Sequence, residues 1–538
     1  MEDKSKNMVN KLSRILKTVT DYGICIYLVL ILGIMPYYNQ EGYAHIGTDK
    51  ARFFDTTIKY TGRLLLPVAG VYLIICAYLS RKELRNRLRD IFSVTDYFAI
   101  GYGVALLISW GFSKYRENAL WGAKGWFMGL LPQLALVLCY LMVSKLWKPR
   151  KWVVYLALAV SWTVFLLGWL NRAGFDPLGM GTYNTSFIST IGNINWYCGY
   201  MMSIFFVGVG IMWQFQEGNS LWKLLLMVYV FIGFGSLLAQ GSDSGMLTLA
   251  VLVLVMFALS VSEGERMRMF WLEMVLLGGA CLTTYIMRAV LPNDSYDLSV
   301  GVGLILVTGW RPFAVTIVSV FGLISVDQSM KRGKYPSKEF DIITKSLAGL
   351  MVTCVSLYVA ALAANTLRPG SLGPLSGNAW FIFNDKWGSG RGATWKAGWM
   401  CFVEQNVLHK LVGVGPDAMS FFEYDAGSDG LQSLLKENFG YLVLTNAHNE
   451  WLTVLVDVGI LGLITFVGMM MTGICRFLKK GRNRITFACG LCLLAYTVNN
   501  MFSFQQSMNT STMFAIFGIG GAFLRESDRK NLNIIGDD

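Results

Sequence analysis

Residues 244–261 read SGMLTLAVLVLVMFALSV, 18 residues without one charged side chain. A helix needs about 20 mostly apolar residues to cross the hydrocarbon core of a bilayer. Similar apolar runs occur on both sides of this stretch along most of the chain. Because only helices that satisfy their own backbone hydrogen bonds, or closed barrels, cross a membrane, the stretch predicts an all-α protein with many spans.

The composition agrees with a membrane protein. Of 538 residues, 54% are hydrophobic and only 15% are charged, which excludes an ordinary soluble globule and a disordered polymer. About 14 spans would take up roughly half of the chain. Working outward from the first stretch, we expect these spans at 22–38, 62–80, 95–112, 126–146, 152–170, 195–213, 224–240, 244–261, 270–290, 300–325, 346–364, 450–473, 485–504 and 513–524.

The basic residues predict the orientation of the spans. The chain has 46 Lys and Arg against 34 Asp and Glu, a net charge of +12. Basic clusters at 81–89, 145–151, 331–345 and 476–484 fall in every second loop, as the positive-inside rule requires of cytoplasmic loops. The charge thus has a membrane explanation, and we expect no nucleic-acid partner.

These patterns predict the organisation of the chain as one integral membrane unit, in which both termini are cytoplasmic. We expect a basic N-terminus at 1–20, a bundle of about 11 helices at 21–365, an extracytoplasmic cap at 366–449, three further spans at 450–524 and a cytoplasmic tail at 525–538.

The segment 366–449, called the cap segment below, is the one long hydrophilic loop. It is too aromatic for a solvated tail, so we expect a folded cap on the outer membrane face. Trp395, Trp399 and Phe402 follow helical spacing, and Arg391 precedes Trp395 by one turn. Arg391 either binds a ligand or only extends its charge to the membrane interface.

His448 lies in NAHNEW, where the cap segment meets the next span. A single histidine at such a place is more often a packing or capping residue than a catalytic one. A neutral imidazole can nevertheless accept a proton near neutral pH. Both interpretations stay open on the residue alone.

Several motifs around these two residues occur in a fixed order. GRGATWKAGW (390–399) is followed by GVGPD (413–417), NAHNEWL (446–452) and DVGILGL (457–463), and STIGNINWYCGYMM (189–202) comes earlier. As an ordered set, they resemble the signature of the O-antigen ligase/polymerase family. Each short motif alone is a weak signal.

The resemblance implies a GT-C-like membrane glycosyltransferase in the bacterial cytoplasmic membrane, with its active site on the extracytoplasmic side. Such an enzyme moves a glycan from a polyprenyl diphosphate carrier to a hydroxyl of a glycan, lipid or protein, with inversion and without a metal or other cofactor. By position, Arg391 matches the arginine that contacts the diphosphate, and His448 matches the histidine that orients or deprotonates the acceptor hydroxyl. Asn449 matches the supporting asparagine beside it. Five further residues fall inside the matching motifs and become candidates for substrate binding, namely Asn193, Asn195, Trp395, Gly413 and Gly415.

One motif departs from the family pattern. Many members carry an arginine in an SRG element after the seventh span, whereas this chain reads GSDSG, with Asp243 near the expected place. We expect Asp243 to cap the following helix. Candidates for the missing cation are Arg172, Arg288 and Arg311, since charges near membrane spans are functional candidates.

Other functions remain open at this point. A metal-dependent transferase would use outer-loop acids such as Asp49 and Asp55, or Asp425 and Asp429. A secondary transporter of a small anion or a glycan-related solute would also have many spans, although paired repeats are not evident. A structural scaffold would need neither Arg391 nor His448. The sequence does not distinguish a polymerase from a ligase, because both perform the same transfer.

Overall fold

The computed structural model describes residues 2–79, 92–123, 126–181, 186–215, 220–291, 302–335, 338–479 and 483–535. The basic cluster at 81–89 and residues 480–482 lie outside these ranges. Nearly all regular structure is helical; one short antiparallel pair, β1 (Phe187–Ile188) and β2 (Gly192–Asn193), joins Phe187 to Asn193.

The first half of the chain contains α1 (Glu2–Val29), the π-helix η1 (Leu30–Ile34), α2 (Ile46–Leu79), α4 (Val94–Phe112), α5 (Arg116–Trp121), α6 (Leu130–Leu146), α7 (Lys151–Arg172), α8 (Ile194–Trp213), α9 (Ser220–Ala239), α10 (Asp243–Ser260) and α11 (Gly264–Val290). The second half contains α12 (Gly303–Leu306), α13 (Arg311–Lys331), α14 (Lys338–Leu367), η3 (Gly373–Leu375), η4 (Ala379–Phe381), α15 (Trp387–Glu404), α16 (Val407–Val412), α17 (Met419–Ala426), α18 (Asp429–Phe439), α19 (Glu450–Phe477), α20 (Arg484–Asn499) and α21 (Ser507–Ile535).

Ten helices of the described residues are long and apolar enough to cross a membrane. Apolar segments of α6, α14 and α20 are shorter, and the last predicted span lies within α21. The expectation of an all-α protein with many membrane spans is therefore confirmed. The count of about 14 spans stays a prediction.

The predicted span 300–325 is wrong at its start. The helix α13 begins at Arg311, with Pro312 in its first turn, and the short α12 precedes it. The reason is that proline lacks a backbone N–H, which the first turn of a helix does not use. Pro312 therefore lies in the first turn of the helix.

The helix α8 lies at the centre of the bundle. Its residues from Tyr197 to Trp213 are all buried, and it packs against α7, α9, α20 and α21. At Gly210, a Cβ atom would come within 2.7 Å of the Ala488 Cα in α20. Small residues of this kind let membrane helices approach closely, so that dispersion contacts can hold them together.

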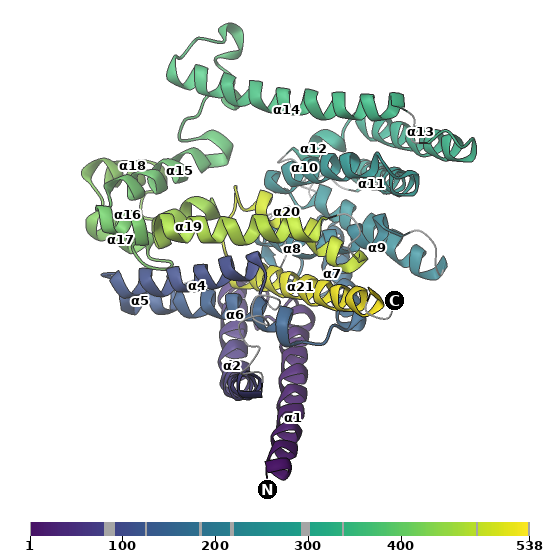
Figure 1. Cartoon of the computed structure of the whole chain (residues 1–538). Helices are drawn as coiled ribbons and strands as arrows, with labels where there is room; N and C mark the ends of the chain where they lie inside the picture. The colour runs from purple at the N-terminus through teal and green to yellow at the C-terminus, as the bar shows by residue number, and fades with distance from the viewer. Residues whose placement is uncertain are drawn as a thin grey trace.

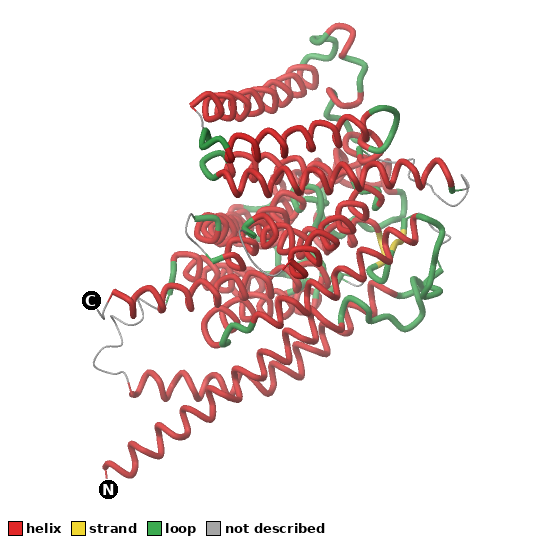
Figure 2. Tube along the Cα trace, turned by 90° about the vertical axis from the view of Figure 1, so that its right-hand side faces the viewer, coloured by secondary structure: helices red, strands yellow, loops and turns green. Residues whose placement is uncertain are grey.

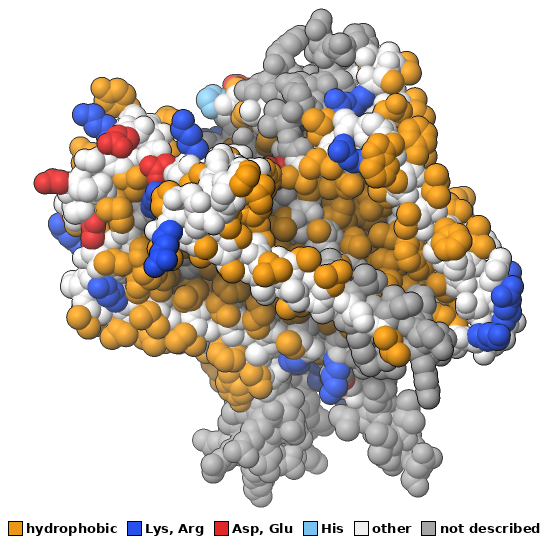
Figure 3. All heavy atoms as spheres, turned by 90° about the horizontal axis from the view of Figure 1, so that it is seen from above, with side chains coloured by type: hydrophobic (Ala, Val, Ile, Leu, Met, Phe, Trp, Pro, Cys, Tyr) orange, Lys and Arg blue, Asp and Glu red, His pale blue; other side chains and the backbone are white. Residues whose placement is uncertain are grey.

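Figure 1 shows that the short helices α15 to α18 gather at one end of the bundle, at the left, while the C-terminus lies at the other end. The long α14 runs along the outside, and Figure 2 shows α1 and α2 extending from the main body. Broad hydrophobic areas cover the face seen in Figure 3, as expected for a surface that contacts lipid.

Ion pairs tie the helices together at the end away from α15 to α18. Asp96, at the start of α4, forms an ion pair with Lys145 of α6, whose Nζ lies 2.5 Å from the carboxylate. Asp21 in α1 forms an ion pair with Arg150, whose Nη2 lies 2.5 Å from the carboxylate. Arg476, near the end of α19, donates to the Ser93 hydroxyl at 2.7 Å. Some basic residues predicted for the cytoplasmic side are thus paired within the fold.

The cap segment is folded and has its own small core. Ala397 and Cys401 of α15 pack with Met419, Phe422 and Leu431 from the two helices that follow α16, and all five are buried. The same cluster includes Val456 of α19. The segment is therefore attached to the bundle through the start of α19.

Candidate functional site

His448 is held in a fixed turn before α19. Asn449 is the N-cap residue, and its side chain accepts a hydrogen bond from Leu452 N at 3.1 Å. His448 itself has a left-handed backbone (φ 48°), and its N–H donates to Asn446 Oδ1 at 3.0 Å. The capping interpretation thus applies to Asn449, and the imidazole is left for another role.

The imidazole of His448 packs edge-on against Phe504, with 4.8 Å between ring centroids. Burial, with a smaller effect of the positive charge of Arg391, lowers the pKa of His448 to about 4. The ring is therefore neutral near pH 7 and can accept a proton. Arg391 contacts the same loop through the Phe502 carbonyl, so the two residues lie at one loop, between α20 and α21.

Arg391 begins the regular part of α15, after Gly388, Ser389 and Gly390 break the helix with left-handed backbones. Its Nε donates to the Phe502 carbonyl at 2.9 Å, and its Nη1 donates to the Gly388 carbonyl at 2.9 Å. Among the described residues, no group accepts a hydrogen bond from Nη2. The guanidinium is oriented by two carbonyls and keeps donors for a ligand.

Trp395 lies on the same face of α15 as Arg391, as the spacing predicted. Its ring is 5.8 Å from that of Phe502, whose carbonyl accepts the bond from Arg391. Trp387 and Phe383 complete this aromatic group, at 5.4 and 6.2 Å from Trp395. Arg391 is half-buried and is held beside this aromatic group. A side chain that only extends its charge to the membrane interface would not be held in this way.

Asp243 does not cap α10, contrary to the expectation. The N-cap residue is Ser242, and the Asp243 carboxylate accepts a hydrogen bond from Val302 N at 2.6 Å. The carboxylate also lies near Arg391. Burial lowers the pKa of Arg391, and the negative charge of Asp243 opposes this shift. The Asp243 carboxylate thus bonds to Val302, a residue distant in the chain, and does not cap its own helix. Helical periodicity cannot predict a contact of this kind.

The GNIN and GSDSG motifs meet beside this carboxylate. Asn193 is the N-cap residue of α8 and accepts a bond from Asn195 N at 2.9 Å. Asn195 Oδ1 accepts a bond from the Ser242 hydroxyl at 3.0 Å, and Ser242 contacts Ser244 at 2.9 Å. Asn193 therefore serves the helix, while Asn195 links two motifs that are distant in sequence.

A buried hydrogen-bond network continues from these motifs to Glu450, the first residue of α19. Its carboxylate accepts bonds from Asn500 and, at 3.1 Å, from the Tyr496 hydroxyl. The network runs through Cys198, Ser244, Asn499, Asn500, Glu450, Tyr496 and Thr510. Sequence reasoning missed Glu450; its position two residues after His448, at the start of an apolar run, was the available signal.

A small cavity of about 30 Å³ lies next to this network, and its lining includes Asp417, Glu450, Asp457 and Phe504. Burial raises the pKa of Asp417 to about 7, although two backbone N–H groups, of Ala123 and Met128, donate to it. Three carboxyl groups thus line the same cavity as Phe504, the residue that contacts His448, and they were not among the predicted site residues.

Gly413 and Gly415 have a packing role. Both have positive φ angles (81° and 126°), and a Cβ on Gly413 would come within 2.1 Å of the Asp457 carbonyl. The Gly415 N–H donates to the same carbonyl at 2.9 Å. The loop therefore docks on α19 where that helix is broken at Gly459 (φ 73°). This contact explains both glycines without a substrate.

We expect Gly459→Ala to destabilise the protein by about 2 kcal/mol or more, because φ is positive and the new Cβ would lie 2.4 Å from the Leu411 carbonyl. The matched control is Gly111→Ala in α4, where a Cβ meets no atom within 4 Å. Thermal unfolding of the purified protein in detergent measures both. Equal melting temperatures of the two variants would contradict the role given to Gly459.

The three candidates for the missing cation differ in position. Arg172 is buried at the end of α7, and its Nη2 donates to the carbonyl of Gln240, directly before GSDSG, at 3.2 Å. Arg288 follows Met287, which packs in the same cluster as Ala173. The Nη1 of Arg288 is buried and has no hydrogen-bond partner among the described residues. Arg311 is exposed at the start of α13, and its Nη1 donates to the Thr308 hydroxyl at 3.4 Å. Arg172 is therefore the best placed of the three.

Three of the four acids considered for a metal are engaged elsewhere, and the fourth, Asp429, is the first residue of α18. Asp55 pairs with Lys59 at 2.7 Å, Asp425 pairs with Lys114 at 2.6 Å, and Asp49 accepts a bond from Gln40 N at 3.0 Å. Within the described ranges, no group of three or more His, Cys, Asp or Glu side chains is arranged to hold a metal ion.

The fold and the site define this chain as an all-α protein with multiple membrane-spanning helices. A scan against protein-family models finds no match, and a search of curated proteins finds no matching relative.

Proposed function

We propose that this protein is a membrane glycosyltransferase that moves a glycan from a polyprenyl diphosphate carrier to an acceptor hydroxyl. The observation that supports it most is the meeting of Arg391 and His448, from two separate motifs, beside the Phe502–Phe504 loop. A cation oriented by hydrogen bonds and a neutral imidazole are the two groups that this transfer needs.

Arg391 would bind the diphosphate. In the reaction, the bond between the anomeric carbon and the diphosphate oxygen breaks, and the electron pair leaves with the diphosphate. Its growing negative charge is stabilised by a planar guanidinium whose donors are already oriented. Asp243 limits the net charge near Arg391, and Arg172 beside GSDSG would supply the second cation.

His448 would orient the acceptor hydroxyl and take its proton as the oxygen attacks the anomeric carbon from the side opposite the leaving group. A pKa of about 4 makes the free imidazole a weak base. A bound diphosphate would raise this pKa, because its negative charge favours the protonated ring and offsets that of Arg391. The base would thus strengthen when the donor is present.

The finer architecture is part of the same proposal. It comprises a GT-C-like arrangement of about 14 spans, cytoplasmic termini, and the cap segment outside a bacterial cytoplasmic membrane. The alternation of basic loops supports this orientation. Lipid-linked donor would then reach the site from the outer leaflet.

We expect a cysteine at position 441 to react with an impermeant thiol reagent in intact cells. Tyr441 is fully exposed in the cap segment, so Tyr441→Cys in a variant without other cysteines should leave the fold intact. A cysteine at Lys223, at the start of α9, is the matched control and should react only after lysis. The reverse pattern would contradict the orientation.

A transfer assay with purified protein and lipid-linked glycan tests the activity. We expect product to form, and to form equally well in EDTA, because guanidinium groups can neutralise a diphosphate without a divalent ion. Loss of activity in EDTA with recovery in Mg²⁺ would favour a metal-dependent transferase. Absence of transfer, together with uptake of a small anion by reconstituted protein, would favour a transporter.

A further inference from the structure

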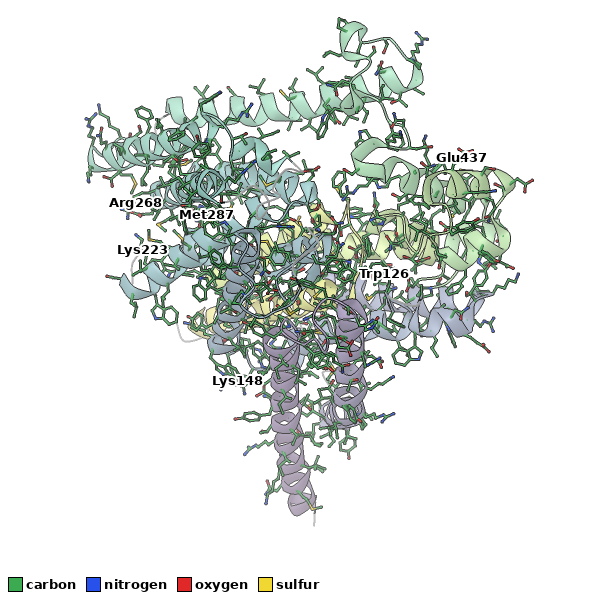
Figure 4. The ribbon with its side chains drawn as sticks, turned by 180° about the vertical axis from the view of Figure 1, so that it is seen from behind. Trp126, Lys148, Lys223, Arg268, Met287 and Glu437 are labelled. Atoms are coloured by element: carbon green, nitrogen blue, oxygen red, sulfur yellow. The ribbon has the colours of Figure 1, made fainter. Side chains whose placement is uncertain are left out.

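A large cavity in the described part of the chain lies away from Arg391 and His448, neither of which lines it. Its volume is about 820 Å³, within the usual range for small-molecule sites. Its lining comes from the first turns of α7, α9 and α20, from the end of α8 and from the turns at 523–527 of α21. These turns form the end of the bundle opposite the cap segment; Figure 4 labels Lys148 and Lys223 on the side away from Glu437.

The walls of this cavity are apolar and aromatic. Tyr155 of α7 and Trp222 of α9 line it with their rings 4.9 Å apart. Leu225 and Val228 of α9 also line it and are 50% and 39% exposed. Because these side chains lie on the outer surface of predicted spans, the cavity opens sideways toward the hydrocarbon of the bilayer.

The polar part of the lining is basic on balance. Lys151 is the first residue of α7 and Arg484 is the first residue of α20; both side chains are exposed. The Arg484 guanidinium lies 5.6 Å from the centre of the Phe215 ring, which fixes it at the edge of the cavity. One carboxylate, Glu526, also lines the cavity. Two cations therefore face one acid.

We infer that this cavity binds one anionic phospholipid of the cytoplasmic leaflet. The phosphate would lie between Lys151 and Arg484, and an acyl chain would fill the apolar space. Basic pockets between membrane helices on the cytoplasmic side are suited to such headgroups. A soluble anion could use the two cations but would gain nothing from the apolar walls, whereas a lipid uses both.

Such a lipid would connect distant parts of the bundle. It would contact α7 and α9 on one side and α20 and α21 on the other. The loop between α20 and α21 carries Phe502 and Phe504, which contact Arg391 and His448. We therefore expect the lipid to stabilise the helices that support the site. The inference does not depend on the reaction proposed for that site.

The test measures phospholipid bound to the purified full-length protein in mild detergent, by native mass spectrometry with added phosphatidylglycerol or phosphatidylcholine. We expect phosphatidylglycerol to bind more tightly. The variant Lys151→Ala/Arg484→Ala should bind it roughly 30-fold more weakly, the loss expected when two basic residues are removed from an anionic headgroup. The matched control, Arg332→Ala/Lys334→Ala, removes two exposed cations that do not line the cavity and should resemble the wild type.

A second variant tests the apolar part. Ala159 lines the cavity with an exposed side chain, so Ala159→Trp should fill the space without disturbing the core, and it should reduce binding of both lipids. Unchanged binding in this variant, or equal losses in the two charge variants, would overturn the inference. Competition by inorganic phosphate alone would contradict lipid binding and show that the cavity binds only a phosphate group. A dimer that is lost in Ala159→Trp would also contradict it and assign the cavity to a second copy of the chain.

Discussion

Replacing Arg391 by lysine should lower the rate of glycan transfer about 10²-fold or more, although the charge is retained. The guanidinium donates to the carbonyls of Phe502 and Gly388 at 2.9 Å each and keeps Nη2 for a ligand. An ammonium lacks the planar arrangement of donors and cannot reproduce this geometry. Loss of one oriented donor to a charge that develops in the transition state typically costs 10²–10³ in rate.

Binding of the lipid-linked donor and its turnover should both fall in Arg391→Lys. Arg368→Lys, an exposed position in the same segment, is the matched control and should behave as the wild type. Melting temperatures of both variants establish that they are folded. If Arg391 only carried its charge to the membrane interface, lysine would serve equally well, and near-native transfer by Arg391→Lys would refute the diphosphate role.

Replacing His448 should separate turnover from donor binding. We expect a loss in turnover of 10²–10⁴, the usual contribution of a general base, with donor affinity nearly unchanged, because His448 would act on the acceptor. His448→Asn is the better variant, since asparagine tolerates the left-handed backbone at this position (φ 48°). His448→Ala removes the ring as well and should give the same result.

His409→Ala provides the control for His448. This histidine lies in the same segment, and its Nδ1 contacts the Gly413 carbonyl at 2.8 Å, away from Phe504. A weakened donor affinity in His448→Asn with unchanged turnover would reverse the assigned roles.

The pH dependence gives a further readout for His448. A base acts only when deprotonated, and the pKa of His448 in the free protein is about 4. The part of kcat/KM that depends on this residue should therefore be constant above about pH 5 and fall as the pH drops through 4. The dependence should be absent in His448→Asn. A decline centred at the ordinary histidine pKa of about 6.5 would show that the imidazole is not buried as described.

The apolar runs were sufficient to predict the class of protein. The 18 uncharged residues at 244–261 are long enough to cross a bilayer, and similar runs recur along the chain, so the class of protein follows from local sequence without tertiary information. The same local logic placed Arg391 and Trp395 on one face of a helix, and their shared contact with Phe502 agrees with it.

The interpretation of single polar residues required the tertiary structure. Asp243 was expected to cap its own helix, yet it bonds to Val302 and lies near Arg391. Gly413 and Gly415 were named from a motif alone, and the structure shows that they allow a loop to dock on α19; substrate binding by them stays a prediction. Each outcome depends on a neighbour that is distant in the chain, and local spacing carries no information about such neighbours.

Hydrophobicity and helical periodicity act within one segment. For this reason the sequence alone determined that the chain is helical, has many membrane-spanning segments and carries an aromatic segment at 366–449 that is folded. Only the tertiary structure decided which of Arg172, Arg288 and Arg311 lies beside GSDSG. It also decided that Glu450 lies within a buried polar network, between Asn500 and Tyr496. A charge is useful to a site through its distance and orientation to other groups, and packing between helices determines both.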